Sequence, residues 1–205
     1  MHCSIVPPSL LRRIARRERG GLQPAADAAR RALVRTAGLD RSRQAKVRQL
    51  SARPGAPAPR AWRELVPERQ VSDAGHTERL PGKRVRDEGG PAVADPADNE
   101  AYDGPGATFD LFARAYGRNS LDDAGEALRA TVHYGRDYDN AFWNGTRMVF
   151  GVGDGQIFPR FTGSLSVIGH ELTHGVIQYA ANFAYQGQSG ALNESVSDVF
   201  ACLVE

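Results

Sequence analysis

The spacing of hydrophobic residues changes along this chain, and each spacing predicts a different kind of element. Residues 9–50, 108–119, 164–181 and 190–205 carry apolar side chains at a helical period. Residues 127–135 alternate between apolar and polar side chains, which is typical of a strand with one buried face. The side chains expected on that face are those of Leu128, Ala130, Val132 and Tyr134.

Turn residues separate these elements. Asn144 and Gly145 suit a tight turn, so residues 140–151 are predicted to form a hairpin with aromatic-rich arms. A loop rich in glycine, glutamine and serine at 186–190 leads into the last predicted helix. The apolar stripe expected on that helix consists of Leu192, Val196, Val199 and Leu203.

The N-terminal stretch predicts short basic helices rather than a globular core. One of them places Leu10, Leu11 and Ile14 on one face, and the next, residues 24–38, is expected to end at Gly38. Residues 51–60, SARPGAPAPR, have the composition of a solvated, cleavable linker. From about residue 70 the composition becomes that of a mixed globular domain.

Charge is divided unevenly between these parts. Residues 1–60 hold 14 Lys and Arg against 3 Asp and Glu, or +11, which leaves 12 of the chain's 26 basic and 21 of its 24 acidic residues, or −9, in residues 61–205. A basic arm joined to an acidic body can bind an external polyanion or dock on its own body. Because the arm has almost no aromatic residue to stack on bases, we expect no nucleic-acid partner and favour docking.

Other bulk features mainly exclude classes of protein. No run of about 18 apolar residues exists, so no membrane span and no membrane partner are expected. The first 20 residues do not read as a classical signal peptide, because Pro7 and Pro8 break the apolar run and the charges follow it. Cys3 and Cys202 are the only cysteines and predict no disulfide framework.

The chemistry is concentrated in residues 167–179, VIGHELTHGVIQY. His170 and His174 are four residues apart, which on a helix leaves about 40° of rotation and ~6 Å of rise between them, so both imidazoles face one point. Zinc binds neutral imidazole nitrogens in this arrangement. Glu171 lies beside His170 and is placed to reach a water at the metal without being a ligand.

A catalytic zinc needs a third protein ligand and an open position. His2, His76 and His133 are poorly placed, and His133, within the alternating strand, is expected to be a buried, hydrogen-bonded histidine. Glu194 on the following helix is the better candidate. Asp198 lies one turn further along the same face, where its carboxylate could accept the second N–H of a metal-binding imidazole.

These segments resemble the thermolysin family (M4) of zinc metalloendopeptidases. The resemblance is carried by GHELTHGV and GALNESVSDVF, by YDNAFWNGTRMVFGVGDG upstream, and by RVRDEGGP, NEAYDG and TVHYG, over about residues 78–205. The N-terminal HCSIVPPSLLRRIA resembles the propeptide of the protealysin-like branch. The resemblance implies an α+β fold of the thermolysin-like (gluzincin) class. Its β-rich N-terminal domain would carry the HExxH helix and follow a small basic helical propeptide.

The family resemblance also assigns roles to residues of this sequence. It implies one catalytic zinc ion bound by His170, His174 and Glu194, with Glu171 as the general base and Asp198 orienting the first histidine. It places an oxyanion donor at Tyr185. At Asn140 and the Ala141 carbonyl it places groups that hold the substrate backbone. Phe142 and Trp143 are as consistent with packing as with a substrate subsite.

Calcium is doubtful on the same comparison. An acidic calcium ligand of thermolysin would fall at Ser166, and serine is a poor replacement for a carboxylate on a hard cation. Glu205 would match another of those ligands but is the last residue. Val152 stands where the family commonly has an acidic residue, with no consequence that the sequence reveals.

The family comparison predicts a domain division. Residues 1–50 are expected to be the propeptide, 51–77 a linker and processing region, and 78–205 the N-terminal peptidase domain with the zinc helix and the start of the third-ligand helix. The C-terminal helical domain is expected to be absent. One side of the zinc helix would then face water, with Ile168, Val176 and Ile177 only partly covered.

The function expected from the sequence is therefore that of a zinc-dependent endopeptidase precursor, and the chain is expected to be incomplete. The alternative is a catalytically weak or inactive zinc-binding fragment. Expected partners are a peptide or protein substrate and the chain's own propeptide, and the expected state is a monomer. Secretion is expected by family resemblance, although the absence of a classical signal peptide leaves intracellular retention open.

Overall fold

The structure is a computed structural model that describes residues 5–16, 21–50 and 65–205, with side chains described in 5–16, 21–36 and 65–205. The predicted linker at 51–60 and Cys3 lie outside these residues. The described helices and strands are α1 (Pro8–Ala15), α2 (Gln23–Leu50), β1 (Arg69–Asp73), β2 (Lys83–Asp87), α3 (Pro96–Tyr116), β3 (Leu128–Val132), β4 (Ala141–Trp143), β5 (Met148–Phe150), the 3-10 turn η1 (Phe161–Gly163), α4 (Leu165–Ala180) and α5 (Gly187–Val204).

The strands form one mixed sheet in the order β2-β1-β3-β5-β4. Strands β1, β3 and β5 run parallel, and each edge strand, β2 and β4, pairs antiparallel with its neighbour. The predicted hairpin is confirmed as β4 and β5. Its turn is stabilised by Asn144, whose side-chain oxygen accepts from the backbone N–H groups of Thr146 and Arg147, both at 3.0 Å.

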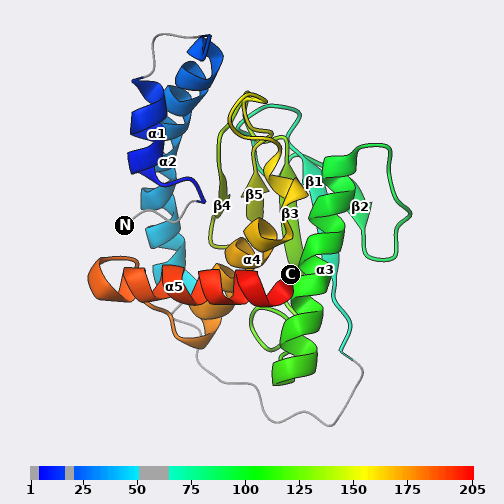
Figure 1. Cartoon of the computed structure of the whole chain (residues 1–205). Helices are drawn as coiled ribbons and strands as arrows, with labels where there is room; N and C mark the ends of the chain where they lie inside the picture. The colour runs from blue at the N-terminus through cyan, green and yellow to red at the C-terminus, as the bar shows by residue number, and fades with distance from the viewer. Residues whose placement is uncertain (1–4, 17–20, 51–64) are drawn as a thin grey trace.

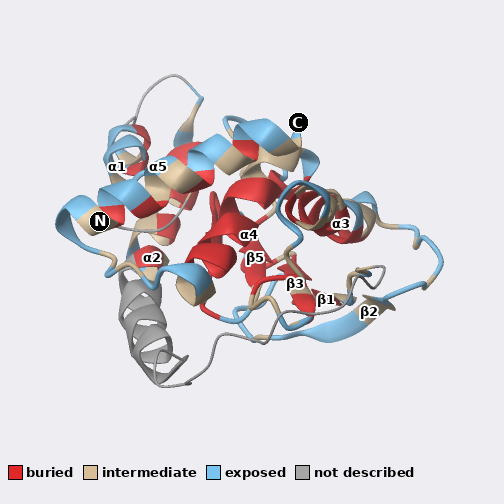
Figure 2. Cartoon of the chain, turned by 90° about the horizontal axis from the view of Figure 1, so that it is seen from below, coloured by how far each residue is buried: buried red, intermediate tan, exposed pale blue. Residues whose placement is uncertain are grey.

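Helices α3 and α4 cover one face of this sheet, and α5 crosses over α4 on the side away from the strands (Figures 1 and 2). The pair α1–α2 lies beside the β4 edge (Figure 1). Figure 2 shows that buried residues concentrate in α4 and in the inner strands β3 and β5, whereas β2 is mostly exposed. The core is continuous with the N-terminal helices, because Leu11, Ile14 and Ala29 belong to the same buried cluster as the sheet. The α+β thermolysin-like architecture expected from the sequence is thus confirmed.

Helix α3 begins earlier than its sequence pattern predicts. The expected helix at 108–119 is only the end of α3, which starts at Pro96. Asp95 caps it by accepting from the backbone N–H of Ala97 at 2.8 Å, and Pro96 occupies the first turn, where no N–H is needed. Pro105 lies inside the helix. Because proline normally ends a helix, the sequence pattern gave no sign of the helical residues before it.

Helix α2 is also longer than expected. It continues through Gly38 to Leu50, so the predicted stop at Gly38 is wrong. A single glycine inside a helix costs only about 1 kcal/mol, and the residues after it include good helix formers. In α1 the predicted apolar face is confirmed for Leu11 and Ile14, whereas Leu10 is 39% exposed.

The sheet begins before the predicted domain start at residue 78. Strand β1 lies within the stretch 51–77 that was expected to be linker, and it pairs in parallel with β3. Strand β3 is shorter than the predicted 127–135, because His133 leaves the strand with a φ of 51°. His133 is hydrogen-bonded as expected, since its Nδ1 lies 3.0 Å from Asp73 Oδ1, but it is only half-buried rather than buried.

The environment of α4 and α5 corrects a further expectation. Ile168, Val176 and Ile177 are all buried, so α4 does not leave these apolar positions in water. The exposed apolar surface lies instead on α5, where Leu192, Val199 and Leu203 are each about half exposed. The residues of α5 that face the protein are small or polar: Gly190, Asn193, Ser197 and Ala201.

Candidate metal centre

Helix α4 carries both histidines and is held close to α5. Its first turn is capped by Ser164, whose hydroxyl accepts from the Val167 N–H at 3.4 Å. Gly169 is required for the close packing, because a Cβ there would lie 2.7 Å from Val204 Cγ1 and 3.5 Å from Ala201 Cα. Small residues at this crossing let α5 approach α4 closely enough to bring Glu194 to the histidines.

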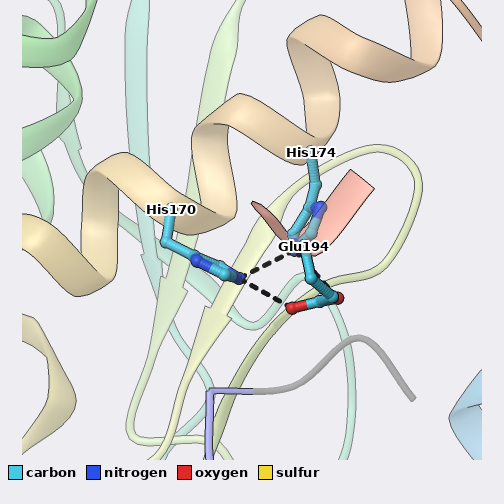
Figure 3. Close-up of side chains that lie close together, drawn as sticks. All are labelled: His170, His174 and Glu194. Atoms are coloured by element: carbon cyan, nitrogen blue, oxygen red, sulfur yellow. Dashed lines mark hydrogen bonds and ion pairs between the residues drawn. The ribbon is translucent and has the colours of Figure 1, made fainter. Parts of the chain in front are cut away.

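Three side chains converge where the helices cross (Figure 3). His170 Nε2 lies 2.9 Å from His174 Nε2 and 3.3 Å from Glu194 Oε2, and His174 Nε2 lies 3.6 Å from Glu194 Oε1. One donor atom from each residue falls within 4.8 Å of the other two. The sequence prediction that these three residues meet is therefore supported by the geometry of the fold.

The remaining ring nitrogens are held from α5. His170 Nδ1 lies 2.9 Å from Asp198 Oδ1, and His174 Nδ1 lies 2.7 Å from Asn193 Oδ1 and 3.0 Å from the Ser197 hydroxyl. Acceptors at Nδ1 fix the proton there and direct the Nε2 lone pairs toward Glu194. Asn193 and Ser197 were not predicted from the sequence, although they directly precede the predicted residues Glu194 and Asp198.

This arrangement fits a cation at the centre. Two neutral imidazoles with their protons on Nδ1 would present two lone pairs to each other at 2.9 Å, which is unfavourable unless a positive charge lies between them. Glu194 Oε1 is buried and has no hydrogen-bond partner among the described residues. Two imidazole nitrogens and one carboxylate are a donor set that zinc uses in catalytic sites, with a further position left for water.

The charge around the site also favours a cation. Burial by itself would lower the pKa of His170, but the hydrogen bond to Glu194 and the charges of Glu171, Glu194 and Asp198 outweigh it, so the pKa is raised. Glu171 is fully buried within α4. Its charge is one of the causes that raise the pKa of His170.

The other predicted site residues lie around this centre or further along the sheet edge. The Tyr185 ring lies edge-on to His174 at a centroid distance of 5.9 Å. Asn140 and Ala141, at the start of β4, contact the N-terminal segment rather than the histidines. Phe142 and Trp143 are almost fully buried, and Trp143 Nε1 donates to Gln178 Oε1 at 3.0 Å, which is a packing arrangement.

Asn140 and Ala141 hold the backbone of residues 5 and 6. The Val6 N–H donates to Asn140 Oδ1 at 2.9 Å, and Asn140 Nδ2 donates to the Val6 carbonyl at 3.3 Å. The Ile5 N–H donates to the Ala141 carbonyl at 3.3 Å. Residues 5 and 6 thus occupy the Asn140 side-chain amide and the Ala141 carbonyl, the groups that the sequence assigned to substrate binding.

No helix in the described part of the chain is both long enough and apolar enough to span a bilayer.

Comparison with known proteins gives consistent matches. The family described as thermolysin metallopeptidase, catalytic domain, matches residues 69–178, and its alpha-helical domain matches residues 181–205. An extracellular metalloprotease of Pectobacterium carotovorum subsp. carotovorum is 44% identical over 203 residues, covering 99% of this chain and 55% of the relative. A thermolysin of Alicyclobacillus acidocaldarius subsp. acidocaldarius is 51% identical over 114 residues, 56% of this chain and 21% of the relative.

Among solved structures, a precursor of protealysin, a metalloproteinase from Serratia proteamaculans, superposes with a TM-score of 0.78 at 44% identity. The match covers 98% of this chain and 54% of that one. Nearly the whole chain is matched by these two relatives, and it spans about half of their length. By the catalytic-domain match and these relatives together, this chain belongs to the thermolysin family (M4) of metallopeptidases and is protealysin-like.

Proposed function

We propose that this chain is the latent precursor form of a zinc-dependent endopeptidase. The observation that carries the proposal is the convergence of His170, His174 and Glu194, with both histidine Nδ1 atoms held by acceptors on α5. His170 Nε2, His174 Nε2 and a Glu194 carboxylate oxygen would hold the ion. Zinc bound there would supply a Lewis acid that polarises the scissile carbonyl and makes a water molecule acidic.

The protein's own groups would perform the proton transfers. Glu171 is fully buried beside His170, so its carboxylate is desolvated and can accept a proton from the attacking water. The same carboxyl group would then deliver that proton to the leaving nitrogen. The Tyr185 hydroxyl would donate a hydrogen bond to the carbonyl oxygen as it gains negative charge.

Substrate would bind along β4. Asn140 and the Ala141 carbonyl already hold a peptide backbone, because they bond that of residues 5 and 6. A substrate peptide would add to the same edge as a further strand. Because the chain's own N-terminal segment occupies these groups, substrate and prosegment would compete for them.

The prosegment would be held by complementary charge as well as by this strand. Arg31 of α2 pairs with Asp137 at 3.0 Å, and Arg35 pairs with Glu78 at 2.6 Å. These pairs agree with docking of the basic arm on the acidic body. We infer that residues 1–50 are the prosegment and that processing cuts before Arg69, since β1 belongs to the sheet of the peptidase domain.

The proposal extends to where and how the protein acts. One relative is named as extracellular, and we propose that this protein also acts on peptides or proteins outside the cell, as a monomer with its own prosegment as its regulatory partner.

Zinc analysis combined with a fluorogenic peptide assay tests the proposal. We expect one zinc per chain. We also expect little cleavage by the latent chain, and cleavage by the processed enzyme that a chelator abolishes and zinc restores. Zinc binding without any cleavage after processing would instead favour the alternative, a zinc-binding fragment without useful activity.

A further inference from the structure

A second group of buried ionisable side chains lies under helix α2. Asp139, directly before the substrate-binding edge, is fully buried, and its carboxylate oxygens have no hydrogen-bond partner among the described residues other than Asp154. Asp154 Oδ2 is buried and unpartnered in the same way. Buried carboxylate oxygens normally have partners, so three such oxygens in one place need an explanation.

The backbone holds these two carboxyl groups together. The Gly151 N–H donates to the Asn140 carbonyl at 3.0 Å, and the Gly153 N–H donates to the Tyr138 carbonyl at 3.3 Å. Gly151 is needed for this approach, because a Cβ there would lie 1.9 Å from the Tyr138 oxygen. Asp154 Oδ1 is used up by the N–H groups of Gln156, Ile157 and Phe158, at 2.7, 2.8 and 3.1 Å, which leaves Oδ2 to face Asp139.

The nearest cation comes from the prosegment. Burial, then the charge of Asp154 and a hydrogen bond with its carboxyl group, raise the pKa of Asp139 to about 8. The backbone N–H of Asp154 and, to a smaller extent, the charge of Arg31 oppose this rise. Arg31 donates to Asp137 through one terminal nitrogen at 3.0 Å, while its Nε is buried without a hydrogen-bond partner among the described residues. The Gln156 side chain, two residues after Asp154, accepts from the Ala25 N–H at 3.3 Å. Helix α2 therefore packs against the segment that carries Asp154.

We propose that Asp139 and Asp154 form a binding site for a calcium ion, which Arg31 of α2 closes in the precursor. The oxygens of both carboxylates suit a hard cation, and calcium accepts irregular geometry completed by water and backbone carbonyls. Because Arg31 and the ion would neutralise the same two groups, they exclude each other. Calcium would therefore bind the body when α2 withdraws, and would favour the undocked prosegment.

This site is separate from the zinc centre and from the acidic position that Ser166 replaces. The proposal also does not depend on peptidase activity, because both states can be compared in the complete 205-residue chain. The substitution Arg31→Gln imitates the release of α2, because it removes the charge that competes with the ion and leaves the rest of α2 in place. Arg30→Gln is the matched control, because the same charge is lost from the adjacent residue, whose guanidinium bonds Asp27 within α2 at 2.7 Å.

The experiment titrates zinc-loaded chains with Tb³⁺, a luminescent substitute for calcium, followed by competition with Ca²⁺. Tyr138, adjacent to Asp139 and fully buried, would sensitise the luminescence. We expect Arg31→Gln to bind one Tb³⁺ that Ca²⁺ displaces with a Kd of about 10⁻⁴–10⁻³ M, the range of weak extracellular calcium modules. The parent chain and Arg30→Gln should bind at least about tenfold more weakly, because Arg31 remains in place.

A double variant assigns the signal to the site. Arg31→Gln combined with Asp139→Asn should lose the Tb³⁺ signal and the rise in melting temperature that Ca²⁺ gives Arg31→Gln. Equal binding by the parent and Arg31→Gln, or binding that survives Asp139→Asn, would overturn the proposal. A folded Arg31→Gln chain that shows neither Tb³⁺ binding nor a Ca²⁺-dependent rise in melting temperature would also overturn it. The two carboxyl groups would then share a proton instead of binding a cation. If Arg31→Gln does not fold, Arg31→Met keeps the aliphatic stem and carries the same expectations.

Discussion

The candidate zinc centre and the Asp139–Asp154 pair both bury ionisable side chains, but they differ in which part of the chain supplies the groups that stabilise them. At the zinc centre, each histidine Nδ1 has an acceptor on α5, so the donor atoms are oriented before any ion arrives. At the pair, three of the four carboxylate oxygens have no hydrogen-bond partner among the described residues outside the pair itself, and the positive charge that acts on Asp139 belongs to Arg31 of α2. The first site is held within the peptidase domain, whereas the second is completed by a segment that processing is proposed to remove. The first should therefore keep its properties when α2 withdraws, and the second should change.

The largest effect is expected at Glu171. In the processed, active enzyme, Glu171→Gln should retain zinc but lose roughly 10²–10⁴-fold in peptide cleavage, because the amide cannot take a proton. Kinetics with a fluorogenic peptide and zinc analysis of the same sample measure both quantities. A variant that keeps more than about a tenth of the parent rate would contradict the role of general base.

A smaller effect is expected from Asp198, which bonds His170 and would hold the ion only through that histidine. Asp198→Asn should weaken zinc binding about 10–100-fold, because the amide holds the imidazole less firmly and lowers its basicity. Competition with a zinc-binding dye measures the affinity. Asp110→Asn, an exposed carboxylate on α3, is the control and should leave the affinity unchanged.

The Asp139–Asp154 pair should respond to pH in the opposite sense to an ordinary salt bridge. The folded-state pKa of Asp139 is raised to about 8, so between pH 4 and 8 the folded chain binds more protons than the unfolded chain. This contribution to stability is complete below the unfolded pKa of about 4 and is lost as pH rises through 8.

Asp139→Asn should therefore stabilise the chain at pH 8, by about 1–3 kcal/mol, and have little effect near pH 4. Urea unfolding at the two pH values, in buffer without divalent cations, measures the difference. Equal effects at both pH values would mean that Asp139 is ionised throughout.

The smallest effect is expected at the rim of the docked prosegment. Arg35→Gln removes the pair with Glu78, whose side chain is 53% exposed, so docking should weaken by less than about 1 kcal/mol. The loss should shrink at high salt, because exposed charges are screened over ~8 Å at 0.15 M. Hydrogen exchange of the α2 amides reports docking, and Arg114→Gln on α3 is the control of equal charge. Faster exchange in that control would point to net charge rather than to the pair.

The convergence of His170, His174 and Glu194 could be predicted from the sequence because the signal for it is local. His170 and His174 are one helical turn apart, and Glu194 and Asp198 repeat that spacing on the next helix. Their meeting depends only on packing two neighbouring helices. Strand β5 and the turn at Asn144 were predictable for the same reason, since their pairing is set by adjacent residues.

The missed features depend on contacts between distant parts of the chain. Strand β1 has too short a pattern to identify alone, and it is defined by its parallel pairing with β3. Helix α3 was misjudged because Pro105 is tolerated inside it. Asp139 and Arg31 are separated by more than a hundred residues, so nothing in their local sequence indicates that they meet.

The most direct test of the account is the zinc content of the purified chain, with the ligand environment read by X-ray absorption. The account predicts one zinc per chain with two imidazole ligands and a carboxylate, and almost none in His174→Ala. Full zinc occupancy in His174→Ala would contradict the assignment of His170, His174 and Glu194 as the metal centre.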